Sequence, residues 1–397
     1  MSTTTVVLLL SAALSLAAGS FSCPSLELCS CVEERVDCAC PLGDEVLDLF
    51  ALFEPDVEYI GVRHCGAVYV PPYLVASLSL QEFTLTDIDR VVVRSLAFEK
   101  VSGLRTLRLR HVRNLTIEHL ALHGLRGTEL VELDNVTAPE LPPAALAGFS
   151  DVQGITVRNS RFGQVHPTAL LFAKGKSFRL VNTTVDRAQN GSLVFDSVST
   201  VDVVNCSFGN VSGAPLSATN VSAVAIRGSV FADLRDRGAL LLLGSANATR
   251  VIFEDNRIGF AGAGALAHLS AGKSVSFARN VILAMGEGSL PLGQSVQFAN
   301  NSLPCFCNAS WMWGQEGARS GHQEAITSSF CSGPLPVAGL RFSDVEPVPG
   351  NGTCRLVSRR HKVLARLSGL PSGCQRPRAA DGGLAPLVLL VAIVRLH

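Results

Sequence analysis

The chain has 397 residues, of which 47% are hydrophobic and only 17% are charged, with 33 basic and 33 acidic side chains. This length is sufficient for a large hydrophobic core. The balance of charge argues against nucleic acid as the main partner.

An apolar run opens the sequence. Residues 1–20 read MSTTTVVLLLSAALSLAAGS, with apolar side chains from Val6 to Ala18 and small residues after them. The run is shorter than the ~20 residues that a membrane-spanning helix needs. A short apolar core followed by small residues is typical of a secretory signal peptide, here cleaved near Ser20, although no Lys or Arg precedes this run.

A dense cluster of cysteines comes next. The segment CPSLELCSCVEERVDCAC, residues 23–40, holds five of the twelve cysteines of the chain. Cysteines in a C-x-C arrangement, such as Cys29 and Cys31, can bind zinc. In a secreted chain without clustered histidines they are expected to form disulfides. A disulfide knot here would cover the open apolar end of the repeats that follow. Cys40 lies about one repeat before Cys65, so these two residues could stack and form a bridge.

A repeat occupies the middle of the chain. Eight slices share the pattern apolar, x, apolar, x, x, small polar, x, apolar, and their starts are 21 to 27 residues apart. The alternation predicts a strand with one buried face, and a fixed period of this length indicates a solenoid whose stacked turns share one core. The slices start at Val131, Ile155, Phe178, Val201, Val224, Val251, Val275 and Val296, with weaker copies from Ile60, Phe83 and Leu107.

Two further positions recur in each turn. A small polar residue, such as Ser160 or Asn256, follows the strand and is expected to bond backbone groups where the chain leaves it. On the return arc a glycine, such as Gly191, permits a bend, and the apolar residue after it closes the core from the other side. Cys206 takes the small polar position of its turn, where we expect a buried free thiol.

The segment after the repeats is again rich in cysteine and then becomes basic. LPCFCNASWMW at 303–313 is followed by Cys331 and Cys354, with Trp311 as an apolar plug. The basic stretch at 355–367 is expected either to contact an acidic glycan or phospholipid or to form a solvated stalk. Its charged residues are Arg355, Arg359, Arg360, His361, Lys362 and Arg366.

The last apolar run, residues 384–394, is too short to span a bilayer in the ordinary way. Small residues at 372–374 and a polar spacer at 375–383 precede it. This order is typical of a glycosylphosphatidylinositol (GPI) attachment signal, with Ser372 as the expected site, although the terminal Arg395 and His397 fit it poorly. Cleavage at Ser372 would remove Cys374.

Together the two cysteine clusters and the repeats resemble extracellular leucine-rich repeat proteins with cysteine-rich caps. The first cap, C-P-…-C-x-C-…-V-x-C, is matched by Cys23, Pro24, Cys29, Cys31, Val36 and Cys38, and the second cap by Cys305, Cys307, Cys331 and Cys354. The resemblance implies disulfides Cys23–Cys31, Cys29–Cys38, Cys305–Cys331 and Cys307–Cys354. The first leucine of the repeat motif is usually replaced, so a right-handed parallel β-helix remains the alternative, especially after residue 178.

The expected fold is therefore mainly β, a right-handed solenoid of about ten to eleven turns of 21–27 residues, of the leucine-rich repeat type. The expected organisation is a signal peptide at 1–20, a cysteine cap at 21–58, the solenoid at 59–303, a second cysteine cap at 304–355, a basic and polar stalk at 356–383 and a hydrophobic tail at 384–397.

Eleven N-x-S/T sequons support a secreted glycoprotein. Four of them directly precede the small polar position, where a straight strand would turn the asparagine inward and a bend would turn it outward. The sequons are at Asn114, Asn135, Asn182, Asn190, Asn205, Asn210, Asn220, Asn247, Asn300, Asn308 and Asn351.

In leucine-rich solenoids the outward residues between the core pairs form the usual binding face, and here the charged ones concentrate in the early turns. The candidates for ligand contact are Arg108, Arg110, His111, Glu132, Asp134, Arg158 and Arg179. No metal or cofactor is expected, because no metalloprotease motif and no G-x-S-x-G is present.

These features favour a non-enzymatic recognition or adhesion protein, secreted or held at the cell surface by a lipid anchor, that binds an extracellular protein or glycan. One alternative is a structural component of the extracellular matrix. Another is a β-helix enzyme acting on polysaccharides, which is disfavoured because no paired carboxylates recur in register beside Lys or Arg on the late turns. The ligand and the oligomeric state do not follow from the sequence.

Overall fold

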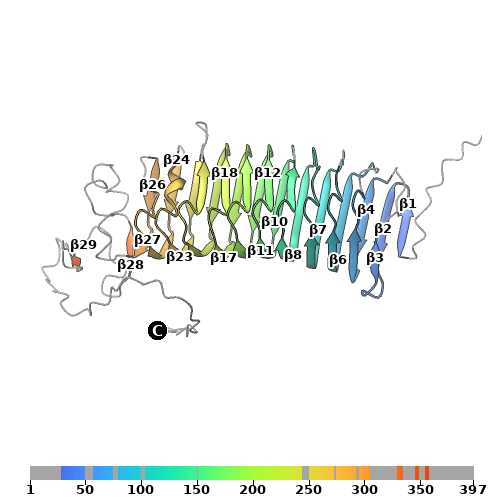
Figure 1. The fold of residues 1–397 in the computed structure, drawn as a ribbon, viewed down its shortest axis with the longest axis horizontal. Coiled ribbons are helices and arrows are strands. Elements are labelled where there is room, and N and C mark those ends of the chain that lie inside the picture. The colour runs from blue at the N-terminus through green and yellow to red at the C-terminus, as the bar shows by residue number, and fades with distance from the viewer. Residues whose placement is uncertain are drawn as a thin grey trace, which may run out of the picture.

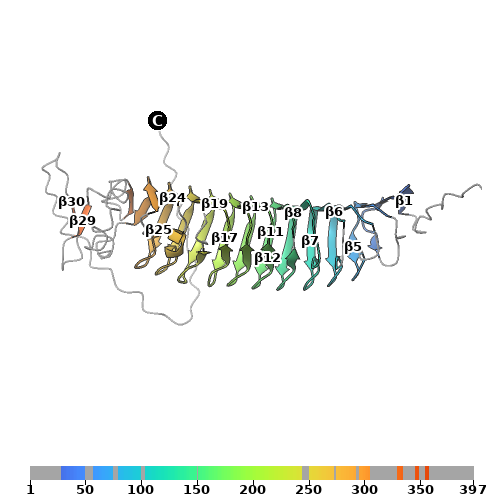
Figure 2. The same cartoon turned by 90° about the horizontal axis from the view of Figure 1, so that it is seen from above.

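The computed structural model describes residues 28–49, 57–74, 79–99, 103–149, 151–243, 250–271, 274–291, 295–304, 329–333, 345–347 and 354–356. Within them the chain is almost entirely β-strand, with one 3-10 helix, η1 (Ala267–Ala271), and no α-helix. The strands form an elongated solenoid of about 10 turns of about 23 residues each (Figure 1). The turns stack along a nearly straight axis (Figure 2). The predicted solenoid is confirmed.

The first sheet contains the strand predicted in each repeat. Neighbouring strands are parallel and pair in the predicted register. For example, Ile155 lies beside Val131 of the turn before and Phe178 of the turn after. Its strands are β2 (Arg35–Ala39), β4 (Tyr59–Arg63), β6 (Glu82–Val93), β7 (Thr106–Ile117), β8 (Leu130–Leu141), β10 (Gly154–Arg158), β13 (Ser177–Val181), β16 (Thr200–Val204), β19 (Ala223–Arg227), β22 (Arg250–Glu254), β24 (Ser274–Ala278) and β26 (Val296–Ala299).

The second sheet continues from the first around a corner. In the early turns the long strands β6, β7 and β8 belong to both sheets, β5 (Ala67–Val70) pairs with β6, and β3 (Val46–Asp48) pairs with β5. In later turns the chain breaks at the corner into separate strands. These are β11 (Arg161–Val165), β14 (Thr184–Ala188), β17 (Ser207–Val211), β20 (Val230–Leu234), β23 (Arg257–Ala261), β25 (Val281–Met285), β27 (Ser302–Pro304) and β28 (Phe330–Gly333).

A third parallel sheet closes the middle turns, so that each of them has three strands. This cross-section is that of a parallel β-helix, the alternative considered above, and it covers Leu146 to Leu243. The preceding turns use irregular arcs on this side, and η1 packs next to the last strand. The five strands are β9 (Leu146–Phe149), β12 (Leu170–Ala173), β15 (Leu193–Asp196), β18 (Leu216–Thr219) and β21 (Leu240–Leu243).

The corner between the first and second sheets is a left-handed backbone residue in every turn from β4 to β26. The residues of this corner column have φ between 49° and 59°. Asn, Asp and Gly tolerate this conformation best, which explains why they predominate. The corner column consists of His64, Asp87, His111, Asn135, Asn159, Asn182, Asn205, Gly228, Asp255, Arg279 and Asn300.

The small polar residues directly after the corner point inward and bond the backbone, as predicted. The Asn256 side-chain amide donates to Oδ1 of Asn280 at 3.1 Å and to the Ile226 carbonyl at 2.9 Å. Asn280 repeats the pattern with Asn301. The residues of this buried polar ladder are Ser160, Thr183, Cys206, Ser229, Asn256, Asn280 and Asn301.

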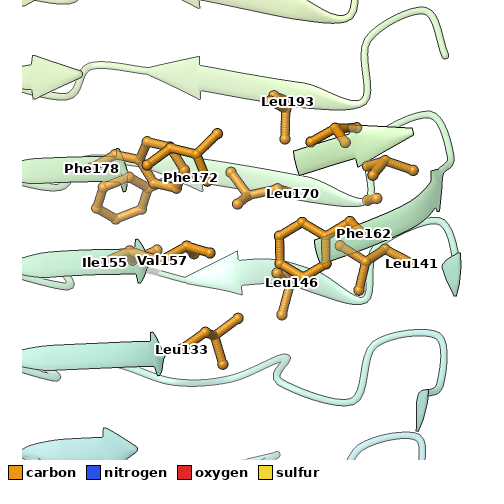
Figure 3. Packing of buried hydrophobic residues seen from close by; sticks show 14 of the residues in the cluster. Leu133, Leu141, Leu146, Ile155, Val157, Phe162, Leu170, Phe172, Phe178 and Leu193 are labelled. Carbon is orange, nitrogen blue, oxygen red and sulfur yellow. The ribbon is translucent and has the colours of Figure 1, made fainter. Parts of the chain in front are cut away.

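The core lies inside the solenoid and receives apolar side chains from all sheets (Figure 3). Ile155 and Phe178 come from the first sheet, Phe162 from the second, and Leu170 from the third. Stacked rings extend the core through the late turns, with the Phe253 and Phe277 centroids 5.3 Å apart. An apolar cavity of about 20 Å³ lies in the middle turns, between residues such as Leu141, Phe162 and Leu193.

The amino-terminal end is closed by β1 (Cys29–Val32), which pairs antiparallel with β2. Disulfides Cys29–Cys38 and Cys40–Cys65 are both present, with S–S distances of 2.01 and 2.04 Å. Cys31 is also disulfide-bonded. Cys29–Cys38 fastens the edge strand β1 to β2, and Cys40–Cys65 joins the first turn to the second. A short edge strand limits the pairing of a sheet with another chain.

At the other end Cys331 is disulfide-bonded, and β29 (Val345–Pro347) pairs antiparallel with β30 (Cys354–Leu356). The expected partners of the capping bridges, Cys23, Cys305 and Cys307, lie outside the described residues, as do Trp311, the signal at 1–20, Ser372 and the tail at 384–397.

Candidate functional site

The outer surface of the first sheet carries the charged candidates, because alternate residues of each strand point away from the core. In β7, Leu107 and Leu109 are buried and Arg108 and Arg110 face outward. The register then places Glu132 beside Arg108. We call this surface, from β6 to β13, the charged face. It contains Glu82, Arg108, Arg110, Glu132, Asp134, Arg158 and Arg179.

Glu132 is the centre of the charged face. Its side chain is only 7% exposed and lies among three arginines. Arg110 Nη2 lies 2.6 Å from Glu132 Oε2, and Arg158 Nη2 lies 2.9 Å from Oε1. Arg108 Nε lies 3.5 Å from Oε2, and the other end of Arg108 bonds Glu82. Charge-assisted bonds of this kind offset the desolvation of a buried carboxylate.

Asp134 extends the network by one position. Arg158 Nη2 lies 2.9 Å from Asp134 Oδ2, and the Asn159 side-chain amide donates to Oδ1 at 2.9 Å. Burial raises the pKa of Asp134, but the hydrogen bonds from Asn159 and Arg158 outweigh burial, so that its pKa falls below the usual range. The carboxylate is therefore held ionised and accepts hydrogen bonds.

Arg110, Arg158 and Arg179 are the most exposed groups of the charged face, whereas Arg108 is less exposed than its partner Glu82. Glu132 and Asp134 have exposed fractions of 7% and 13%, whereas Arg158 is 44% exposed. Arg179 is 60% exposed, and its Nε is 4.0 Å from Asp202. A molecule that approaches this surface therefore meets guanidinium donors first, although the carboxylates beneath them balance most of the charge.

His111 lies at the edge of this surface. It belongs to the corner column, where its Nδ1 is 2.8 Å from Asp87 Oδ1. His64 Nδ1 lies 3.7 Å from the other oxygen of the same carboxylate. The sequence analysis placed His111 beside Arg110 on one face, but the left-handed turn at His111 directs it to the edge.

The charged face ends in the later turns. The outward residues Ala225, Ile252 and Ala278 of the same sheet are buried. A separate ion-pair group follows at the corner, where Arg279 Nε lies 2.7 Å from Asp255 Oδ1 and Arg279 Nη2 lies 2.9 Å from Glu254. Candidate contacts therefore concentrate in the early turns.

The described sequon asparagines are all exposed. Four of them lie on the corner column and point outward, because the chain already bends there. They are Asn135, Asn182, Asn205 and Asn300, while Asn114 and Asn210 lie on the second sheet and Asn190 and Asn220 at other bends. Asn247, Asn308 and Asn351 lie outside the described residues.

Sequence reasoning missed several partners of the charged face. Glu82 lies one residue before the first apolar residue of its repeat, outside the pattern used to select outward positions. Asn159 reads as a bend residue, yet it bonds Asp134. Aligning the repeats and inspecting the flanking positions would have brought Glu82 into the set.

Among the described residues no group of three or more His, Cys, Asp or Glu side chains is arranged to hold a metal ion. The same part of the chain contains no helix that is long and apolar enough to cross a membrane. No protein-family model matches this sequence, and no curated protein is significantly similar to it.

Proposed function

We propose that this protein is a non-enzymatic recognition or adhesion protein of the cell surface or extracellular space. It binds an extracellular ligand that carries carboxylate or sulfate groups, through the charged face. The observation that carries the proposal is the layered arrangement of this surface, in which Arg158 and Arg179 are exposed above Glu132 and Asp134. Arginine is well suited to such ligands because its planar fork of donors matches both anions.

The expected extracellular or cell-surface localisation of the protein supports this role. The apolar leader, the sequons and the GPI-type tail are features of a surface glycoprotein, and the disulfides are compatible with an oxidising compartment. The cysteine caps resemble those of extracellular leucine-rich repeat proteins. The straight stack of turns presents the arginines along one flat surface, which suits an extended ligand.

Catalysis by the same surface is less well supported. A general acid needs a carboxyl group that stays protonated near the working pH, which burial usually achieves by raising the pKa. The pKa of Asp134 is shifted in the opposite direction by its hydrogen bonds with Asn159 and Arg158, which outweigh burial. Glu132 is surrounded by arginines, so both carboxylates are suited to positioning the guanidinium groups.

The test is binding of the secreted chain to cultured cells by flow cytometry. Arg179→Glu reverses the most exposed arginine of the face with the least disturbance, because its ion partner is 4.0 Å away. Arg187→Glu is the matched control, an exposed arginine on the second sheet. We expect Arg179→Glu to weaken binding about tenfold or more, as the loss of a contact worth ~2 kcal/mol would do, and the control to bind normally.

Two enzyme treatments of the cells distinguish the sources of the anionic groups. Loss of binding after heparinase treatment identifies a sulfated glycan, and loss after protease treatment alone identifies an acidic protein. Equal binding by native protein, Arg179→Glu and Arg187→Glu would exclude the charged face as the binding surface.

A further inference from the structure

The second sheet carries an exposed apolar patch in its late turns. Val230, Phe260, Leu283 and Phe330 are 41%, 38%, 45% and 37% exposed and lie on β20, β23, β25 and β28. We call these four residues the late apolar patch. The other exposed large hydrophobic residues of the described chain all lie before residue 75. Phe260 and Leu283 are neighbours, since Phe260 pairs with Ala284 on the adjacent strand. Exposed apolar side chains that gather on one sheet of a secreted protein mark a surface that another group covers.

Exposed sequons lie beside the patch on its amino-terminal side. Asn210 is in β17, and the register places Asp233 next to it and Phe260 next to Asp233. Since neighbouring strands are about 4.8 Å apart, Asn210 and Phe260 are separated by roughly 10 Å across the sheet. Asn205 lies at the corner that leads into β17, whose Ser207 pairs with Val230.

Another exposed sequon lies within the patch, at the strand between those of Leu283 and Phe330. Asn300 occupies the corner that leads into β27, and its left-handed backbone turns the side chain outward. Ser302 of that strand pairs with Val281 on one side and with Phe330 on the other. Potential glycan attachment sites therefore lie before the late apolar patch, at β17, and within it, at the corner that leads into β27.

We propose that N-linked glycans on Asn205, Asn210 and Asn300 cover the late apolar patch and keep the protein from associating through it. In the attachment step the asparagine amide nitrogen bonds to the anomeric carbon of an oligosaccharide carried on a lipid pyrophosphate. The bond from that carbon to the pyrophosphate breaks, and the amide loses a proton. Such glycans are bulky and solubilising. A second copy of the chain is a less suitable cover, because glycans beside the patch and within it would obstruct its approach.

Three substitutions remove these glycans without disturbing the corner asparagines. Ser207→Ala, Ser212→Ala and Ser302→Ala destroy the sequons of Asn205, Asn210 and Asn300 but leave each asparagine in place. The full chain is produced in a mammalian secretory host, and binding of the dye anilinonaphthalene sulfonate and light scattering are measured. We expect the triple variant to bind several-fold more dye than the native protein and to self-associate.

The control removes the same number of glycans elsewhere. Thr116→Ala, Thr137→Ala and Thr184→Ala destroy the sequons of Asn114, Asn135 and Asn182, which lie in earlier turns. This variant should bind dye and scatter light like the native protein. Equal dye binding by the two triple variants would overturn the proposal, as would glycopeptide mass spectra that show Asn205, Asn210 and Asn300 unmodified in the native protein.

A rescue experiment assigns the effect to the patch itself. Adding Phe260→Ser and Leu283→Ser to the triple variant should return dye binding and scattering to native levels. Enzymatic trimming of glycans from the folded native protein provides a measurement that does not depend on how the variants fold. Trimming should raise dye binding in the native background but not in the Phe260→Ser, Leu283→Ser background, and an equal rise in both would place the apolar surface elsewhere.

Discussion

The side-chain amide of Asn256 donates a hydrogen bond to Oδ1 of Asn280 at 3.1 Å, and both side chains are buried inside the solenoid. The same oxygen also accepts from the backbone N–H of Asn256 at 3.0 Å. One asparagine therefore satisfies two donors of the turn before it, and its own amide bonds the carbonyl of Phe253. Removing one member of such a buried hydrogen-bond network is costly in free energy, because the groups that it bonded are left unsatisfied.

Asn280→Ala should therefore destabilise the protein strongly. The change leaves the backbone N–H and side-chain amide of Asn256 without their acceptor and the Phe253 carbonyl without its donor. Each buried unsatisfied group costs about 1–3 kcal/mol. We expect the free energy of unfolding, measured by urea denaturation, to fall by at least ~3 kcal/mol.

Asn280→Ser is the informative comparison for the same site. Serine occupies the equivalent position at Ser160 and Ser229, where its hydroxyl accepts from the backbone of the preceding turn. This variant should lose clearly less stability than Asn280→Ala. If the two variants unfold at the same urea concentration, hydrogen bonding is not what the buried polar ladder contributes.

The corner column predicts a second pair of variants. Gly228 has φ 59° and follows Asn205 in the column. A β-branched side chain in this conformation should cost about 1–2 kcal/mol, so Gly228→Val should lower the melting temperature. Gly228→Asn should cost less than Gly228→Val, because asparagine occupies this corner in other turns, although its Cβ displaces the side-chain oxygen of Asn205. Equal melting temperatures for Gly228→Val and Gly228→Asn would contradict this explanation of the corners.

The repeat was predictable from the sequence because each turn repeats the same physical requirements. Apolar pairs such as Ile155 and Val157 alternate with polar residues, and their spacing fixes which residues stack. The third sheet was harder to predict from the sequence. Leu193 to Asp196 forms a strand, while the same arc in the turns before Leu146 is irregular, because short apolar runs suit either conformation.

The charged face was predictable as a set of residues but not as a network. The alternation of apolar and polar residues along each strand identifies Arg108, Arg110 and Glu132 as outward residues. Their contacts with one another depend on the distances between turns. The register brings the arginines close to the carboxylates at 2.6–2.9 Å, so charges that seemed available for a ligand largely satisfy one another. The corner position of His111 was missed because a polar residue can follow a strand in either conformation.

Cys206 allows a test of how tightly the turns are packed. The thiol is free and buried, and burial raises its pKa to about 11. The thiolate is the reactive form, so iodoacetamide at pH 8 should leave Cys206 unmodified in the folded protein and label it after unfolding in urea. Mass spectrometry of the peptide that contains Cys206 gives the result, and rapid labelling of the folded protein would show that this part of the solenoid opens readily.

Asp134 predicts how the stability depends on pH at the acid end. The ordinary pKa of an aspartate is 3.8; burial raises the pKa of Asp134, but the hydrogen bonds from Asn159 and Arg158 outweigh burial and lower it in the folded protein. A carboxyl group whose pKa is lowered by folding stabilises the folded state above its unfolded pKa. This stabilisation declines as the pH falls below 3.8 and is lost once the pH passes below the folded pKa.

Asp134→Asn should therefore reduce the free energy of unfolding at pH 7, and the difference from the native protein should shrink as the pH is lowered below 3.8. Asn159→Gly keeps the left-handed corner but removes one hydrogen-bond donor to Asp134, so its effect should have the same direction and be smaller. Chemical denaturation from pH 7 to pH 2.5 measures both variants. A difference between Asp134→Asn and the native protein that stays constant over this range would mean that the ionised carboxylate does not contribute through these hydrogen bonds.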